Sequence, residues 1–126
     1  MKILIVDDSA SFRAFARGLL AAVTGDVEEC EDGADATAVY ARCRPDIVLM
    51  DIGMKRVDGL AATRAIVGQD PSARIVIVSS YDDDAFRRAA REAGACGYAL
   101  KDDLSTLTLL IRAACAGRDL PSGLAT

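Results

Sequence analysis

Residues 46–52 read DIVLMDI, and this stretch decides the fold. The four residues before Asp51 are all apolar, which is typical of a parallel strand covered on both faces. Further strand candidates recur along the chain at 3–6, 26–30, 75–78 and 97–100. The second of these is polar enough to be an edge strand. The question left open is what an acid does directly after an unbroken apolar strand.

Helical patterns fill the intervals between these strands. We expect helices over 9–23, 33–43, 57–69 and 82–93, and a last helix from 104 to near 117. In the first helix, Phe12, Phe15 and Leu19 recur at steps of three and four, which predicts one apolar stripe. Strict alternation of strands and helices predicts an α/β fold, with a parallel sheet between helical layers and right-handed crossovers.

Length and composition limit the classes of protein. The chain has 126 residues, of which 52% are hydrophobic and 27% charged, so it fits one domain with a real core. We expect this domain to span residues 1–117, with a tail or the start of a linker over 118–126. A formal net charge of −4 argues against direct nucleic-acid binding by charge and is ordinary for a soluble domain.

Two further absences narrow the expectations. No stretch approaches the roughly 20 consecutive apolar residues of a membrane-spanning helix, and acids follow the first apolar run too soon for a signal peptide. We therefore expect a cytoplasmic protein that does not engage a membrane. The four cysteines form no CxxC pair and histidine is absent, which disfavours a thiolate metal centre or a His-dependent triad.

Polar residues follow the predicted strands at the point where each strand ends. Asp7 and Asp8 follow the first strand, Asp51 the third, Ser79 the fourth and Lys101 the fifth. Because the carboxyl ends of parallel strands meet at one edge, where open α/β sheets bind ligands, we expect these side chains to form a site.

The chemistry of that cluster favours a hard divalent cation. Like charges about 4 Å apart repel by roughly 4 kcal/mol at an effective dielectric of 20, so clustered carboxylates raise a pKa or recruit a cation. Oxygen ligands without histidine favour Mg²⁺, which keeps positions open for a phosphoryl group. Phosphoryl transfer needs mainly positioning and charge neutralisation, and a carboxylate can be the nucleophile.

Each of these residues also has a simpler structural role. Asp7, Asp8 and Ser9 could cap the helix that follows, and Ser79 could bond to its own backbone. Asp51 could be a turn residue, Lys101 a solvated charge, and Tyr98 part of the core packing. Together, these simpler roles would require a coincidence at four strand ends.

Four motifs carry a resemblance to a known family. They are VDDS at 6–9, DIVLMDIGMKRVDG at 46–59, VIVSSYDD at 76–83 and GACGYALKD at 94–102. With these spacings the chain resembles the receiver domain of two-component response regulators over residues 1–117, and is most similar to the NarL/LuxR type. The resemblance implies a flavodoxin-like (βα)5 three-layer sandwich with strand order 2-1-3-4-5.

The resemblance implies a role for each residue of the cluster. Asp51 would be the phosphoacceptor, attacking a phosphohistidine of a sensor histidine kinase or phosphotransfer protein. Asp8 would bind Mg²⁺ directly and Asp7 through water. The backbone carbonyl of Gly53 would supply a further Mg²⁺ ligand, and Lys101 would pair with a phosphoryl oxygen. Ser79 would be the switch hydroxyl, and Tyr98 the aromatic residue that turns inward after phosphorylation.

Output is expected through the face formed by the fourth helix, fifth strand and fifth helix. Ser79 and Tyr98 border that face, so we expect it to bind an output domain or protein partner, or to form a homodimer on phosphorylation. NarL/LuxR receivers usually precede a DNA-binding domain. We expect no catalysis beyond phosphoryl acceptance and autodephosphorylation.

The chain departs from the family pattern at two positions. Lys55 replaces a usual proline in the loop after Asp51. Asp102 replaces another after Lys101, which makes a cis peptide there unfavourable by roughly 2.5–4 kcal/mol. Gly53 and Tyr81 stand at positions that vary within the family and tune the lifetime of the phosphoryl group.

Other functions remain open at this point. A pseudo-receiver would use the same fold to bind partners without phosphorylation of Asp51. A small phosphatase with an aspartyl intermediate would need a second acid and a substrate-selecting cap. A flavin carrier of flavodoxin type would need a Ser/Thr/Gly-rich phosphate loop after the first strand, and the sequence has none there.

Overall fold

The computed structural model describes residues 1–54, 57–103 and 105–115. Five parallel strands form one sheet in the order β2-β1-β3-β4-β5, as the resemblance implied. The strands are β1 Lys2–Val6, β2 Asp26–Cys30, β3 Ile47–Asp51, β4 Ile75–Ser79 and β5 Gly97–Leu100. The helices are α1 Ala10–Leu20, α2 Gly33–Cys43, α3 Gly59–Gln69, α4 Asp84–Ala93 and α5 Ser105–Cys115.

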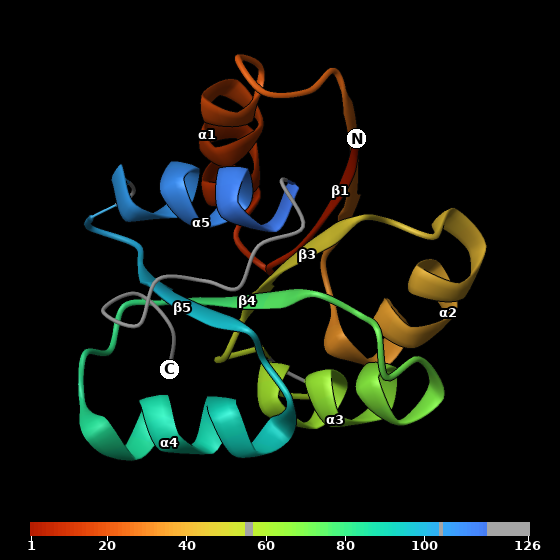
Figure 1. Ribbon diagram of the computed structural model, residues 1–126, viewed down its shortest axis with the longest axis vertical. Coiled ribbons are helices and arrows are strands. Elements are labelled where there is room, and N and C mark those ends of the chain that lie inside the picture. The colour runs from red at the N-terminus through yellow and green to blue at the C-terminus, as the bar shows by residue number, and fades with distance from the viewer. Residues whose placement is uncertain (55–56, 104, 116–126) are drawn as a thin grey trace.

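The helices cover both faces of the sheet, so the fold is the predicted three-layer α/β sandwich. Figure 1 shows α1 and α5 on one side of the strands and α2, α3 and α4 on the other. The residues of β3 and β4 are buried throughout, which explains why the first four residues of each strand are apolar. In the edge strand β2 only Cys30 is buried, as its polar sequence predicted.

Two hydrophobic clusters form the core, one on each side of the sheet. The odd residues of β1, such as Ile3 and Ile5, pack with Leu107, Leu110 and Ile111 of α5. The even residues of β1, Leu4 and Val6, belong to the other cluster, which includes buried residues of α2 and α3. Because side chains alternate across each strand, one apolar run supplies both clusters.

Several helix boundaries differ from the prediction, and capping explains two of them. The side chain of Asp58 accepts a hydrogen bond from the backbone N–H of Ala61, so α3 begins at Gly59 rather than at residue 57. In the same way, Asp83 accepts from Phe86 and starts α4 two residues later than expected. The predicted end of the last helix near 117 and the tail over 118–126 lie outside the described residues.

The predicted apolar stripe of α1 is wrong at Phe15. This side chain is 59% exposed, whereas its neighbour Ala16 is fully buried against the sheet. Phe12 and Leu19 do pack against the cluster shared with α5. The stripe is therefore rotated toward Ala16 and Leu20, and α1 also ends at Leu20 instead of continuing to residue 23.

Two close backbone contacts position the segment that follows Asp51. A Cβ built on Gly59 would lie 1.9 Å from the carbonyl oxygen of Asp51, and one on Gly33 would lie 2.3 Å from that of Val57. Glycine at these positions lets the start of α3 approach the carboxyl end of β3, and the start of α2 approach Val57 in the segment before α3. No helix among the described residues is long and apolar enough to span a lipid bilayer.

Candidate functional site

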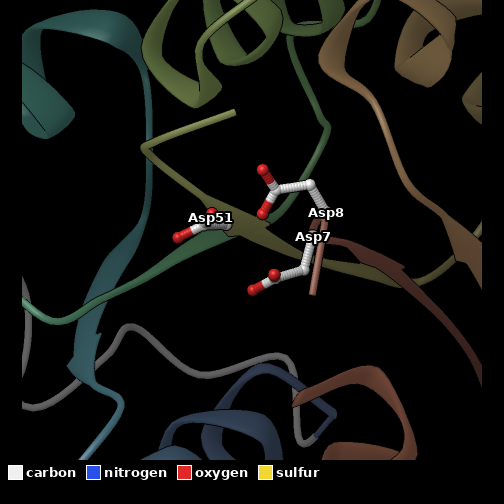
Figure 2. A group of neighbouring side chains, drawn as sticks. All are labelled: Asp7, Asp8 and Asp51. Carbon is white, nitrogen blue, oxygen red and sulfur yellow. The ribbon is translucent and has the colours of Figure 1, made fainter. Parts of the chain in front are cut away.

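Three carboxylates meet at the carboxyl edge of the sheet. Asp7 and Asp8 follow β1, and Asp51 ends β3, whose Met50 pairs in register with Val6 of β1. One carboxylate oxygen of each aspartate lies within 4.8 Å of those of the other two, and Figure 2 shows the three side chains gathered at this edge. Asp7 is 1% exposed and Asp51 9%, whereas Asp8 is exposed to solvent.

Lys101 joins the cluster from the end of β5. Its Nζ lies 2.8 Å from Oδ2 of Asp7 and 3.3 Å from Oδ1 of Asp51. The backbone N–H of Lys101 donates to the carbonyl of Ser79 at 2.8 Å, which fixes the start of this segment beside β4. The ends of three strands, β1, β3 and β5, thus deliver three acids and one ammonium to one place, and the sequence predicted this convergence.

The charges of the cluster favour the binding of a cation. Burial raises the pKa of Asp51, and the charge of Asp7 raises it further, although Lys101 acts in the opposite direction. Burial lowers the pKa of Lys101, but its contacts with Asp7 and Asp51 outweigh that effect, so the net pKa is raised. Three carboxylates with one ammonium leave an excess of negative charge, which a hard divalent cation suits.

The simpler structural roles coexist with this cluster. Ser9 caps α1, because its Oγ accepts from the N–H of Phe12 at 3.2 Å. Oδ1 of Asp7 accepts from the N–H of Ser9 at 2.8 Å, while its other oxygen contacts Lys101. Asp7 therefore shapes the turn after β1 and takes part in the site at the same time.

Ser79 and Tyr98 both form hydrogen bonds with the backbone of Tyr81. Oγ of Ser79, which is 1% exposed, accepts from the N–H of Tyr81 at 3.0 Å. The hydroxyl of Tyr98 donates to the carbonyl of Tyr81 at 2.6 Å. Tyr98 is only 2% exposed, and this burial raises the pKa of its hydroxyl. The ring that the resemblance expected to turn inward is thus already buried in this structure.

The residues that border the site show how open it is. Gly53 is exposed, and a Cβ at this position would meet no atom within 4 Å. The Tyr81 ring is 55% exposed and stacks on Phe86 of α4 with ring centroids 5.0 Å apart.

The described peptide bonds include no cis form, as expected with Asp102 in place of proline. Lys55, the other residue that replaces a usual proline, lies outside the described residues.

Sequence reasoning missed three side chains that position the site. The Phe12 ring lies 4.5 Å from Nζ of Lys101, where the sequence placed it only in a core stripe. Arg13 donates from Nη1 to the carbonyl of Asp7 at 2.6 Å and from Nε to Glu29 at 3.0 Å. Arg87 lies over the Tyr98 ring. A cap at Ser9 places residues 12 and 13 in the first helical turn, so their proximity to the site could have been predicted from the sequence.

Comparisons with known proteins agree with this geometry. The family model of the response regulator receiver domain matches residues 3–112. The crystal structure of a two-component response regulator of the LuxR family from Aurantimonas sp. matches this chain with a TM-score of 0.87 and 37% identity. The match covers 96% of this chain and 89% of the Aurantimonas chain.

Curated relatives include regulators and an enzyme. The transcriptional regulatory protein DegU of Brevibacillus brevis is 34% identical over 104 residues, which are 81% of this chain and 44% of DegU. A protein-glutamate methylesterase/protein-glutamine glutaminase of Geobacter metallireducens is 44% identical over 99 residues, 75% of this chain and 28% of the relative. The chain thus spans less than half the length of either relative. From the family match together with the fold and the acidic cluster, we conclude that this chain belongs to the response regulator receiver domains of two-component systems, with LuxR-type regulators among its relatives.

Proposed function

We propose that the chain accepts a phosphoryl group on Asp51 and thereby switches a partner or an output domain. The single observation that carries this proposal is the meeting of Asp7, Asp8 and Asp51 within 4.8 Å, with Lys101 in contact with two of them. Phosphorylation and Mg²⁺ dependence are general features of the family. The donor set here is all oxygen and carries excess negative charge, so it fits Mg²⁺.

The chemistry assigns a task to each group. A carboxylate oxygen of Asp51 attacks the phosphorus of a phosphohistidine, the N–P bond breaks, and the histidine nitrogen leaves with the bonding electrons. Asp8 and Asp51, with Asp7 through water and the carbonyl of Gly53, would hold Mg²⁺, which neutralises charge on the phosphoryl oxygens when bound. Lys101 would pair with one of those oxygens.

Ser79 and Tyr98 would carry the change away from the site. Shifting an equilibrium from 1:99 to 99:1 takes about 5.5 kcal/mol, whereas one charge-assisted hydrogen bond from Ser79 supplies about 1.5–3 kcal/mol. Support for a joint mechanism comes from Tyr81, which accepts from Tyr98 and donates to Ser79. The α4–β5–α5 face is the surface that this pair borders, and we propose it as the contact for an output domain, a protein partner or a second copy.

The donor is proposed to be a sensor histidine kinase or a phosphotransfer protein. Receiver domains are generally not enzymes, although one relative that contains such a domain is named a methylesterase. We propose that this chain catalyses only its own phosphorylation and dephosphorylation.

Intact-mass measurement after incubation with acetyl phosphate and Mg²⁺ tests the proposal. The wild type should gain one phosphoryl group, and D51N or chelation of Mg²⁺ should prevent the gain. D46N is the matched control, because Asp46 is the other acid of DIVLMDI and lies just before β3. A wild type that binds partners but gains no mass would support a pseudo-receiver instead.

A further inference from the structure

The ammonium of Lys101 has three close neighbours of two kinds. Two are the carboxylates of Asp7 and Asp51, at 2.8 and 3.3 Å from Nζ. The third is the face of the Phe12 ring, whose centroid lies 4.5 Å from Nζ. A cation within about 6 Å of an aromatic centroid is attracted by the negative face of the ring. Lys101 is therefore held by two charged groups and one neutral one.

The position of the Phe12 ring is fixed by the same segment that carries the acids. The N–H of Phe12 donates to the capping Oγ of Ser9 at 3.2 Å. The next residue, Arg13, binds both the carbonyl of Asp7 at 2.6 Å and Glu29 at 3.0 Å. The first turn of α1 is thus tied to the end of β1. Phe12 is partly buried and packs against the core cluster on that side of the sheet.

The neutral contact differs from the charged ones in what happens during phosphoryl transfer. Asp51 becomes an acyl phosphate in the proposed reaction, and the site's carboxylates are the groups that a cation would engage. Both carboxylates that contact Lys101 are therefore engaged by other groups at the step in which its ammonium would pair with a phosphoryl oxygen. The Phe12 ring takes no part in either event, and lysine has a flexible four-carbon stem that needs such a constraint.

We propose that Phe12 is a positioning residue for phosphoryl transfer, whose ring face keeps the Lys101 ammonium beside Asp51 throughout the reaction. This inference rests on the proposed function of Asp51. It differs from a plain packing role, which requires only the size and apolarity of the ring. The two roles respond differently when the ring keeps its shape and loses the negative charge on its face.

Fluorinated phenylalanines separate the two roles. Phenylalanine with one, two and three ring fluorines is incorporated at position 12, which weakens the electrostatic attraction stepwise with little change in ring size. The rate of phosphorylation by acetyl phosphate at saturating Mg²⁺ should fall stepwise, by roughly 3- to 10-fold across the series for a partly desolvated cation–π contact. The same series at Phe15, which is 59% exposed on the same helix, should leave the rate unchanged.

Natural substitutions and a spectroscopic readout complete the test. F12L should be as slow as the trifluoro variant, whereas F12Y, which keeps an electron-rich ring face, should stay within about 2-fold of wild type. In proton NMR spectra, the ε-methylene protons of Lys101 should be shifted upfield by the ring in the wild type, and that shift should be lost in F12L.

The outcomes distinguish this inference from the proposed function. A phosphorylated wild type with equal rates across the fluorinated series would overturn the role of Phe12 and leave that of Asp51 intact, as would Lys101 ε-methylene protons without an upfield shift. A wild type that gains no phosphoryl group would overturn the proposed function, and the role of Phe12 in transfer with it.

Discussion

The guanidinium carbon of Arg87 lies 4.7 Å from the centroid of the Tyr98 ring. Arg87 comes from α4 and Tyr98 from β5, so this contact joins two of the three elements of the proposed output face. Arg87 is itself held by Asp82, with Nε and Nη2 each 3.0 Å from Oδ1. The Tyr98 ring is thus covered by the guanidinium while its hydroxyl binds the carbonyl of Tyr81.

Replacing Arg87 with alanine should release the Tyr98 ring. R87A removes a cation–π contact of about 0.5–2 kcal/mol, and we expect the free energy of unfolding to fall by about 1 kcal/mol in urea denaturation. The ring resonances of Tyr98 should broaden or shift toward solvent-exposed values in NMR spectra. R88A changes an exposed arginine of the same helix and should do neither. Equal spectra for R87A and wild type would contradict the role of this contact.

Mg²⁺ should stabilise the folded protein through the acidic cluster. At 100 times its Kd, a ligand that binds only the folded state adds about 2.7 kcal/mol to the free energy of unfolding. D8N should lose most of this gain. In a chelator the same variant should be more stable than wild type, because one of three neighbouring like charges is gone.

Chemical denaturation with and without Mg²⁺ measures both effects of D8N. D82N is the control, since Asp82 pairs with Arg87 outside the cluster. A D8N protein that responds to Mg²⁺ as strongly as the wild type would place the cation elsewhere.

Gly59 and Gly53 form a matched pair for the loop after Asp51. A Cβ on Gly59 would clash with the carbonyl oxygen of Asp51 at 1.9 Å, so G59A must move the backbone that carries the acceptor. We expect a loss of about 1–3 kcal/mol in the free energy of unfolding and slower phosphorylation. At Gly53, where a Cβ meets no atom within 4 Å, alanine should change stability by less than about 0.5 kcal/mol. Equal stability of G59A and G53A in urea denaturation would contradict the close approach of α3 to β3.

Tyr40 should make stability depend on alkaline pH. Burial and then the hydrogen bond to Asp70 at 2.7 Å raise the pKa of Tyr40 from 10.0 to about 12. Between these values the folded state keeps a proton that the unfolded state has lost. Stability is therefore fully present below pH 10 and should fall as the pH rises toward 12.

Y40F should remove that fall, because no hydroxyl titrates at this position. Urea denaturation at pH 9, 10 and 11 compares wild type with Y40F, and Y81F serves as control because the Tyr81 side chain is 55% exposed. A wild-type stability that declines no faster than that of Y40F would show that the Tyr40 hydroxyl is not sequestered from solvent.

Much of the fold was predictable because burial on both faces leaves a clear pattern. A strand such as β3 is apolar at each of its first four positions, and such runs alternate with helices along the chain. The acidic cluster was predictable for a related reason, since parallel strands all end at one edge. Asp7, Asp51 and Lys101 meet there although they are far apart in sequence.

What the sequence could not predict depends on contacts between elements. Phe15 and Ala16 are adjacent, and the smaller side chain is the one that is buried in the core cluster. The steps of three and four fit either choice. Similarly, nothing in the sequence of α4 separates Arg87 from Arg88, and only the packing of α4 beside β5 selects the residue that covers Tyr98.

The most direct measurement identifies the residue that carries the phosphoryl group. The protein is incubated with acetyl phosphate and Mg²⁺ and then reduced with borohydride, which converts an aspartyl phosphate to homoserine. Tandem mass spectrometry of the peptides then locates the change. Homoserine at position 51, and its absence after chelation of Mg²⁺, is the predicted result. Homoserine at another aspartate, or at none, would contradict the assignment of Asp51 as the acceptor.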